Sequence, residues 1–427
     1  MARKAVRANP RKGKTAPAQD PPARSSVAMR GLSIWCATAR PFSSHALDQN
    51  VRADVCVVGA GIAGLTTAYL LACEGKSVVV LEKDKIGGGE TSHTSAHLSN
   101  AMDAGYRKIE STSSPKNARL IAHSHSSAIT RIDTIVAKEH IDCGFERVNG
   151  YLFCGPNTAQ EDLHQEFQSA RRARVSVKEL EIPPGRLQLG RCLQFGRQAQ
   201  FHPLKYMAGL AAAFKRRGGR IYTATEAEEI SGGESAEIKT AHNKKVSARA
   251  IVVATNAPVI DRANLRSKQT AFRSYVIGIP VPKNSIPRAL YWDTEDPFHY
   301  VRLQRVKEGR TERHVLLVGG EDHKLDESQD IEERFAHLRA WAPTHFGPLG
   351  DPEFHWSGTV MNTFDGLALI GQNPGDEPNV YIATGDSGMG ITHGTIAGIL
   401  LTDSIMGRAN PWTALYDPAR PNPLSQK

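Results

Sequence analysis

The stretch DVCVVGAGIAGLTTAYLLACEGKSVVVLE, residues 54–82, decides the fold class of this 427-residue chain. Two short apolar runs flank a helical pattern, and the glycines of a GxGxxG motif stand between the first run and the helix: Gly59, Gly61 and Gly64. In such a motif the first glycine allows a tight turn, the second lets the backbone approach a pyrophosphate, and the third lets the helix pack on the strand. The stretch therefore predicts a strand–helix–strand unit whose helix N-terminus binds the phosphates of a dinucleotide.

An acidic residue extends this prediction from the phosphates to a ribose. Glu82 ends the second apolar run, near the roughly 20-residue distance at which a carboxylate binds a ribose hydroxyl. The spacing predicts a strand over 54–58, a helix over 62–74 and a strand over 77–82. The motif is shared by NAD and FAD enzymes, so it does not by itself identify the dinucleotide.

Two later segments favour FAD. Residues 248–258, ARAIVVATNAP, form a buried strand pattern whose end can close over a dinucleotide, and residues 383–401, ATGDSGMGITHGTIAGILL, place a second glycine loop before a second helix. A reduced flavin ring carries negative charge that a helix N-terminus stabilises, whereas a nicotinamide ring has no such need. We therefore predict FAD as the cofactor.

The charge of the chain is concentrated at its N-terminus. Residues 1–30 contain eight Lys or Arg and one Asp, so seven of the nine net positive charges fall there. This basic arm is too polar to order itself, and three interpretations stay open: a disordered tail, an organelle-targeting segment, or a chain that starts at Met29. It lacks the apolar centre of a secretory signal. We expect a cytoplasmic protein, with organelle targeting through the arm as the alternative, and no nucleic-acid partner.

The remaining composition excludes several classes of protein. No apolar run reaches the length of a transmembrane helix. The six cysteines form no CxxC pair, and none has a histidine two positions later, as an iron–sulfur ligand pair would require. Free cysteines in apolar contexts suit a reducing compartment. We predict no metal site.

Nucleotide-binding patterns occur in three blocks, separated by longer alternating strands, and this interleaving predicts a discontinuous organisation. We expect an α/β fold in which a Rossmann-like FAD-binding domain contains a second, antiparallel-sheet substrate domain, inserted discontinuously. The predicted segments are a disordered basic arm (1–32), the FAD-binding domain (33–125, 200–262 and 355–420) and the substrate domain (126–199 and 263–354).

The sequence resembles the FAD-dependent oxidoreductases of the D-amino-acid oxidase, glycine oxidase and sarcosine oxidase type, from about Ser33 to Arg420. The segments that carry the resemblance are VVGAGIAGLTTAYLL, LEKDKIGGGETSHTSAH, HPLKYMAGLAAA, IVVATNAP, HYVRLQ, LLVGGEDHK, DGLALIG and YIATGDSGMGITHGTIAG. It is most similar to a subgroup that often carries a C-terminal Rieske domain, but no Rieske ligand pattern occurs here. The resemblance implies a glutathione-reductase-type FAD domain. Because the Rieske pattern is missing, we expect oxygen or another acceptor, and not an on-chain cluster, to take the electrons.

The resemblance also implies the residues that contact FAD. Those expected at the ADP half are Gly59, Gly61, Ile62, Ala63, Gly64, Glu82 and Lys83. Those expected along the pyrophosphate and ribityl chain are Gly88, Thr91, His93, Thr94, Ala96 and His97. Those expected at the strand ends and at the ring are Ala227, Ala254, Thr255, Asp365, Gly388, Met389, Gly390, Ile391 and Thr392. For the loop 88–97, a Gly/Ser/Thr-rich surface turn is the alternative.

His93 raises the question of a covalent flavin. Some relatives attach the flavin through a histidine in a context such as GSTWH, and GETSH here is similar but lacks the tryptophan. We favour non-covalent FAD, with a link through His93 as the alternative.

The substrate residues are predicted from HYVRLQ and LLVGGEDHK. Tyr300 and Arg302 stand two apart on one face of a strand. The resemblance implies that Arg302 binds a substrate carboxylate, for which its planar fork is suited, and that Tyr300 lines the pocket; a surface arginine is the alternative. His323, which we count with Tyr300 and Arg302 among the candidate catalytic residues, and Lys324 could face the flavin and tune its reactivity with oxygen, with solvation of one of them as the alternative. His393 would be catalytic or cap its helix.

Together these features predict an enzyme that oxidises the C–N bond of an amine or amino acid by hydride transfer to flavin N5, giving an imine that hydrolyses. Catalysis would depend mainly on the orientation of the substrate over the flavin and on electrostatic stabilisation of the reduced flavin. It would not require a strong protein base. Two alternatives stay open: a flavoprotein acting on another small substrate, such as a 2-hydroxy acid, and a flavin-binding redox sensor without catalytic activity.

Overall fold

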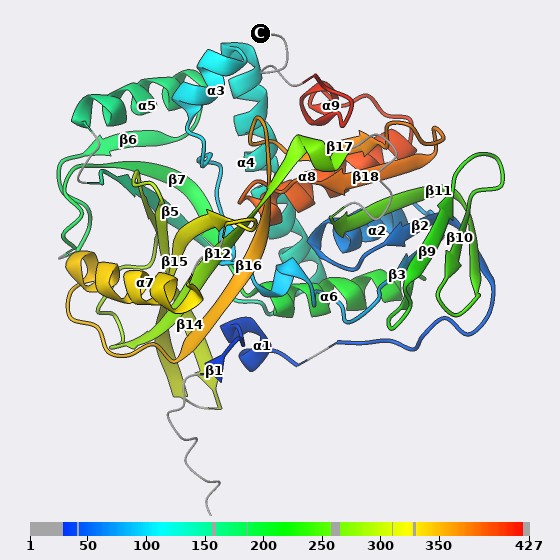
Figure 1. Cartoon of the computed structure of the whole chain (residues 1–427), viewed down its shortest axis with the longest axis horizontal. Helices are drawn as coiled ribbons and strands as arrows, with labels where there is room; N and C mark the ends of the chain where they lie inside the picture. The colour runs from blue at the N-terminus through cyan, green and yellow to red at the C-terminus, as the bar shows by residue number, and fades with distance from the viewer. Residues whose placement is uncertain are drawn as a thin grey trace, which may run out of the picture.

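The computed structural model describes residues 29–40, 42–155, 159–185, 187–257, 265–309, 311–327 and 330–421, and its strands form two sheets that lie side by side (Figure 1). The helices are α1 (Ile34–Thr38), α2 (Ile62–Cys73), η1 (Glu90–Ser92), α3 (Tyr106–Thr112), α4 (Pro115–Glu139), α5 (Gln160–Arg172), α6 (Pro203–Arg216), η2 (Leu265–Lys268), α7 (Ile331–Phe346), α8 (Gly390–Ile405) and α9 (Thr413–Tyr416). The strands are β1 (Met29–Arg30), β2 (Val51–Val58), β3 (Val78–Leu81), β4 (His97–Leu98), β5 (Glu146–Phe153), β6 (Val177–Leu180), β7 (Cys192–Gln200), β8 (Arg220–Tyr222), β9 (Ala227–Ser231), β10 (Glu237–Thr240), β11 (Lys245–Asn256), β12 (Gln269–Val281), β13 (Leu290–Asp293), β14 (His299–Glu308), β15 (Thr311–Lys324), β16 (Phe354–Thr363), β17 (Leu369–Gln372) and β18 (Val380–Thr384).

The eight-stranded sheet contains the glycine motif. Its order is β17-β18-β11-β2-β3-β8, with β10 pairing with β11 and β9. The strands from β18 to β8 run parallel to one another. The central strands of this sheet consist of runs of apolar residues, and β3 is buried throughout, because both faces of the sheet are covered. Helix α2 is apolar on all sides for the same reason, since it packs between this sheet, α6 and α8.

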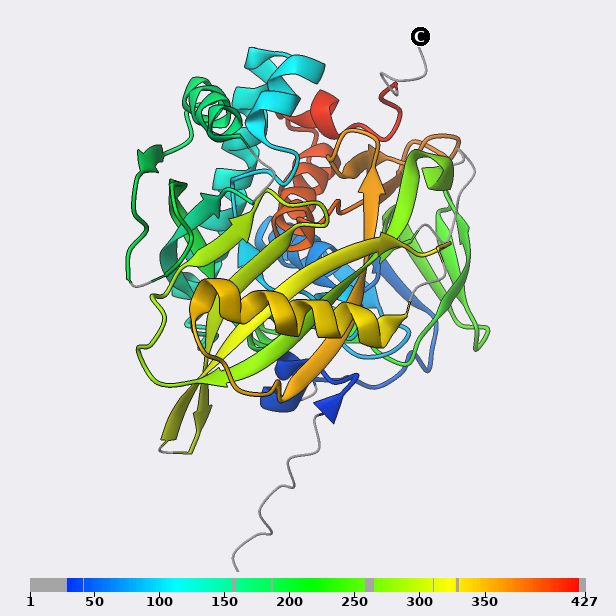
Figure 2. The same cartoon turned by 60° about the vertical axis from the view of Figure 1, so that its left-hand side comes forward.

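The ten-stranded sheet has the order β1-β16-β12-β15-β14-β13-β5-β7-β4, with β6 pairing with β7. All its pairs are antiparallel except β1 with β16 and β13 with β5. Helix α7 lies across one face (Figure 2), where Leu338 and Phe346 pack on Tyr291 and Ile277. On the other face, Leu317 and Trp356 belong to the same hydrophobic core as Leu65 of α2. The fold is thus the predicted α/β class with a second sheet.

The segments differ from the predicted division at three places. All of strand β16 except Phe354 lies within the predicted block 355–420, but the strand belongs to the ten-stranded sheet because it pairs with β12 along its full length. Helix α4 continues through the predicted boundary between residues 125 and 126. Met29 and Arg30, assigned to the disordered arm, pair with β16 as β1; residues 1–28 lie outside the described residues.

None of the helices in the described part of the chain combines the length and the apolar character that crossing a bilayer would require. All six cysteines are free thiols.

Candidate active site

A cavity of about 910 Å³ lies between the two sheets and is lined by residues of both. It extends from Glu82 and Lys83, after β3, past the first turns of α2 and α8 to Tyr300 on β14. Its volume is at the upper end of the usual range for ligand pockets, about 300–1,000 Å³. The cavity therefore connects the predicted nucleotide end with the predicted substrate end.

The first end of the cavity is built by the glycine motif. Gly59 has φ +103°, and a Cβ there would lie 2.4 Å from the carbonyl oxygen of Ala254, so only glycine allows β2 and β11 to end this close together. A Cβ on Gly61 would meet only Thr91 Oγ1, at 3.4 Å, so space is open in front of α2. Glu82 accepts hydrogen bonds from the backbone N–H groups of Ala60 and Asp84, both at 2.8 Å. This arrangement fits a pyrophosphate at the helix start and a ribose near the carboxylate.

The wall beside it is the loop of residues 93–96, whose four carbonyls are each held by a side chain from another element. The bonds run from Trp356 Nε1 to His93 O (2.8 Å), from Trp35 Nε1 to Thr94 O (2.6 Å), and from the Arg302 guanidinium to Ser95 O (3.3 Å) and Ala96 O (2.8 Å). Thr91 is also fixed, since its hydroxyl accepts from the N–H of Ile62 at 3.2 Å. This loop is a fixed wall of the cavity, which does not fit the alternative of a surface turn.

The second helix start, at α8, closes the opposite side of the cavity. Residues 388–391 line it, and the hydroxyl of Thr392 bonds back to the Met389 carbonyl at 3.0 Å. His393 Nδ1 donates to the carbonyl of Asp386 at 2.8 Å. Burial lowers the pKa of His393 to about 4, so its ring is neutral. The contact holds the turn before α8 but is not a helix cap, since no side chain caps α8, and His393 also lines the cavity.

Comparison with known proteins now decides the family. The profile of the family described as FAD dependent oxidoreductase (DAO) matches residues 54–404. The chain belongs to the DAO family. It is an FAD-dependent oxidoreductase.

Individual relatives agree with this assignment. The putative Rieske 2Fe-2S iron-sulfur protein YhfW of Bacillus subtilis (strain 168) is 30% identical over 392 residues, covering 91% of this chain and 75% of the relative. The gamma-glutamylputrescine oxidoreductase of Escherichia coli (strain K12) is 26% identical, covering 90% of each chain. Among solved structures, glycine oxidase from Geobacillus kaustophilus superimposes with a TM-score of 0.71 at 20% identity, covering 87% of this chain and 99% of that one.

The predicted FAD contacts of this DAO-family chain divide into two groups. Those on the cavity wall are Gly59, Gly61, Ile62, Ala63, Glu82, Lys83, Thr91, His93, Thr94, His97, Ala227, Ala254, Thr255, Gly388, Met389, Gly390 and Ile391. Those that do not line it are Gly64, Gly88, Ala96, Asp365 and Thr392. Gly64 is needed instead for packing, because a Cβ there would lie 2.0 Å from Gly59 O.

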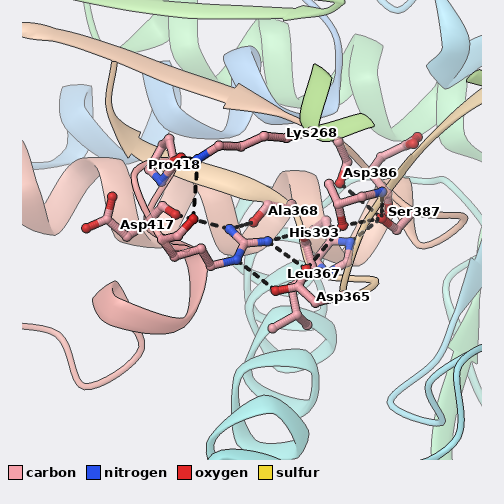
Figure 3. A network of polar contacts seen from close by, with 12 residues as sticks. Lys268, Asp365, Leu367, Ala368, Asp386, Ser387, His393, Asp417 and Pro418 are labelled. Atoms are coloured by element: carbon pink, nitrogen blue, oxygen red, sulfur yellow. Dashed lines mark hydrogen bonds and ion pairs between the residues drawn. The ribbon is translucent and has the colours of Figure 1, made fainter. Parts of the chain in front are cut away.

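Asp365 belongs to a network of polar contacts with the C-terminal segment (Figure 3). Arg420 forms two hydrogen bonds of 2.8 Å with its carboxylate and also donates to the carbonyls of Leu367 (2.6 Å) and Ala368 (3.1 Å). Lys268 donates to Pro418 O at 2.8 Å. Ala368 lines the cavity, so the C-terminal segment fixes this part of the DAO-family site.

Changing Arg420 to methionine should loosen the loop 365–368 and weaken FAD binding about tenfold, since a bidentate charged pair of this kind contributes about 1.5–3 kcal/mol. The FAD dissociation constant of the apoprotein would measure this. Arg408, a surface arginine that pairs with Asp403 at 2.8 Å, provides the matched control. Equal affinity in the Arg420 and Arg408 variants would contradict the prediction.

Arg302 does not occupy the position expected of a carboxylate-binding residue. It lies on the same face of β14 as Tyr300, as predicted, but only 1% of it is exposed and it does not line the cavity. Its guanidinium is engaged by carbonyls of the loop, by Phe201 O at 3.2 Å, by Gln304 Oε1 and by the Trp35 ring. Arg302 thus holds the loop of residues 93–96, and its side chain does not face the cavity.

His323 lies on the wrong face of β15 for its predicted role, because a β-bulge reverses the alternation. Residues 321 and 322 together oppose Ser274 of β12, and Glu321 has φ +58°. The extra residue turns every following side chain to the other face. His323 therefore stacks on Tyr275 on the α7 side, and Asp322 takes its place in the cavity.

Tyr300 does reach the cavity, next to Ser274. Its hydroxyl lies 2.9 Å from Ser274 Oγ, and its ring lies over Gly319, where a Cβ would be 2.2 Å from the ring. Trp292 and Phe298 line the same end. This end of the cavity thus combines an aromatic wall with hydroxyl groups.

A cluster of Asp293, Glu295 and His299 near the cavity has ligand-type atoms within 4.8 Å of one another. His299 Nδ1 lies 2.8 Å from Asp293 Oδ2, and its Nε2 lies 3.4 Å from Glu321. Burial alone would lower the pKa of His299, but these carboxylates raise it to about 9. His299 and the surrounding carboxylates of Asp293, Glu295 and Glu321 thus form a buried network of ion pairs beside the cavity.

Several residues of the site were missed by sequence reasoning. Trp35 and Trp356 carry no motif, and their role depends on a loop far away in the chain. Asp103 and Asp322 line the cavity. Asp322 stands inside the quoted segment LLVGGEDHK, but its orientation depends on the bulge.

Proposed function

We propose that this enzyme oxidises the C–N bond of a small amine or amino acid. When bound, FAD would accept a hydride from the substrate carbon at N5, and the resulting imine would hydrolyse in water. The observation that carries the proposal is the single cavity onto which two helix starts open, with Tyr300 at its far end. The relative named gamma-glutamylputrescine oxidoreductase, 26% identical over 398 residues, supports an amine-type substrate.

The chain's own residues would act mainly by orientation and electrostatics. The first turns of α2 and α8 present N–H groups and partial positive charge, which suit the phosphates and a reduced ring. The loop of residues 93–96 keeps its shape because its carbonyls are already bonded. Tyr300 and the aromatic wall would bind the substrate and exclude water.

Anaerobic reduction of the bound flavin tests this proposal. The purified holoenzyme is mixed without oxygen with amines, polyamines, D- and L-amino acids and 2-hydroxy acids, and loss of the yellow absorption band is followed. We expect bleaching by at least one compound that contains a C–H next to nitrogen. Bleaching by 2-hydroxy acids alone would support the alternative substrate class. No bleaching by any compound would support the redox-sensor alternative.

Admitting air to the reduced enzyme separates the candidate acceptors. Rapid recovery of the yellow colour with formation of hydrogen peroxide would identify an oxidase. Slow recovery that an added electron carrier accelerates would identify a dehydrogenase.

We also propose that the FAD is bound without a covalent link. His93 Nδ1 lies 3.3 Å from both Gly89 O and Ser92 Oγ, which supports a ring engaged within its own loop. Acid denaturation and filtration should leave all yellow colour in the filtrate, and a His93→Ala variant should release the same FAD. Colour retained with the wild-type precipitate, and lost from it in His93→Ala, would contradict this.

A further inference from the structure

Four aromatic side chains of the ten-stranded sheet and its loops line the substrate end of the cavity: Phe195, Trp292, Phe298 and Tyr300. The ring centroids of Phe195 and Trp292 lie 5.6 Å apart, and those of Phe298 and Tyr300 lie 5.9 Å apart. Both distances are within the range at which aromatic rings interact favourably. We call these four side chains the ring row.

The strand pairing places the two central rings side by side on one face of the sheet. Trp292 is the direct partner of Tyr300 where β13 pairs with β14, and of Leu152 where β13 pairs with β5. Residues directly opposite each other in neighbouring strands present their side chains to the same face. Leu152 also lines the cavity. Three adjacent strands therefore give this end of the cavity a continuous apolar wall.

Two glycines let these rings lie close against the sheet. A Cβ on Gly150 would be 2.5 Å from Cη2 and 2.6 Å from Cζ3 of Trp292, and a Cβ on Gly319 would be 2.2 Å from Cε2 of Tyr300. A larger residue at either position would push the ring away from the backbone. Trp292 and Tyr300 are half-buried and line the cavity. Each ring thus rests on the sheet and remains accessible from the cavity.

The charges around the ring row favour an uncharged group there. Among the described residues that line the cavity, the only Lys or Arg residues are Lys83 and Arg266. Lys83 follows β3 at the nucleotide end, and Arg266 belongs to η2, which packs in the core of the eight-stranded sheet. Asp293, next to Trp292 in the chain, faces the protonated His299 at 2.8 Å. The ring row therefore offers an apolar surface and no cation for an anionic group.

The arrangement of the rings also distinguishes a flat ligand group from a compact cation. A cage for an alkylammonium ion holds the ion over ring faces that surround it. Trp292 and Tyr300 instead come from neighbouring strands of one sheet and form one side of the cavity. An aromatic ring can cover such a surface by offset stacking or by edge-to-face contact. The ring row therefore fits a flat group.

We infer that the substrate is an amine that carries an aromatic ring, and that Trp292 binds this ring. This inference rests on the proposed function. The Tyr300 ring lies 5.5 Å from the ring of His97, which follows the loop of residues 93–96, so the reacting C–N bond lies near Tyr300. Trp292 is one strand away, about 5 Å. Two carbon atoms between the nitrogen and the ring span this distance.

The test compares 2-phenylethylamine, 2-cyclohexylethylamine and butylamine in anaerobic flavin reduction by the holoenzyme. The dependence of the reduction rate on amine concentration gives a dissociation constant and a limiting rate for each compound. We expect 2-phenylethylamine to bind at least about tenfold more tightly than butylamine, because it buries a ring, and about threefold more tightly than 2-cyclohexylethylamine, which is apolar but not flat. Equal affinity for 2-phenylethylamine and either other amine would overturn the inference.

Variants of the ring row test the role of Trp292. Trp292→Leu should raise the dissociation constant of 2-phenylethylamine about tenfold and change that of butylamine less than about twofold. Trp292→Phe keeps a ring and should lose less affinity. Gly150→Ala keeps the indole but displaces it, so it should also weaken binding of 2-phenylethylamine selectively. Equal loss of affinity for both amines in these variants would contradict the assignment.

Two checks keep the variants interpretable. Phe167→Leu replaces a partly buried aromatic residue of α5 that does not line the cavity, and both dissociation constants should stay within about twofold of the wild type. The ratio of flavin to protein shows whether each variant is folded and loaded. If Trp292→Leu fails this check, Trp292→Phe and Gly150→Ala provide the comparison.

Binding without turnover separates this inference from the proposed function. Neither 2-phenylethanol nor 1-butanol contains an amine, and binding of each is followed through the shift of the flavin absorption band. Reduction by amines without a preference for ring compounds in either assay would overturn the inference and leave amine oxidation intact. If no amine or amino acid reduces the wild-type flavin, the proposed function fails and the substrate assignment fails with it. Tighter binding of 2-phenylethanol than of 1-butanol, lost in Trp292→Leu, would in that case still support Trp292 as a ring-binding residue.

Discussion

Replacing Arg302 by methionine is expected to weaken FAD binding at least about 100-fold. The change removes the donors that hold the carbonyls of Ser95, Ala96 and Phe201. Each buried acceptor left unpaired costs about 1–3 kcal/mol, and two of them account for a 100-fold effect. Titrating the apoprotein with FAD and following the flavin fluorescence measures the dissociation constant.

Two variants make this result specific. Arg302→Lys keeps the charge but not the planar fork, so it should recover only part of the affinity. Arg305→Met removes an arginine from the same strand that is 38% exposed, and it should leave FAD binding unchanged. If Arg302→Met kept its FAD but lost affinity for carboxylated substrates alone, the carboxylate-binding interpretation would be correct and the positioning role wrong.

The parts of the fold that sequence predicts best are those fixed by local steric demands. The strand, glycine turn and helix around Gly59 follow from spacing alone, and so does the second helix start at α8. In each case the information lies within a few residues of the element.

The site residues that sequence misplaces depend on distant partners. Alternation along β14 predicts the face of Arg302 correctly, but not that Trp35 and the loop of residues 93–96 occupy the space in front of it. Alternation along β15 fails because one bulge exchanges His323 for Asp322. A bulge has no strong sequence signal here, since Glu321 is not a glycine although its φ is +58°.

Replacing Gly394 by valine is expected to weaken FAD binding about 100-fold. A Cβ at this position would lie 2.6 Å from Ile62 Cγ2 and 3.1 Å from the backbone nitrogen of Ala63. Ile62 and Ala63 form the first turn of α2, whose N-terminus opens on the cavity. The larger side chain would push the two helix starts apart, and the N–H groups of α2 would lose their position relative to the phosphates.

The effect is large because the atoms of α2 next to Gly394 cannot easily move aside. Backbone atoms cannot rotate away as a flexible side chain can, and overpacking in such a place costs about 1–3 kcal/mol or more. Gly398→Ala, which would bring a Cβ within 2.5 Å of Thr66 Cγ2 one turn further along, should show a smaller loss because α2 is displaced away from its phosphate-facing end. Gly350→Ala meets nothing within 4 Å and should bind FAD like the wild type. Should Gly394→Val fold and bind FAD as tightly as Gly350→Ala, close approach of α2 and α8 would not be a requirement of the site.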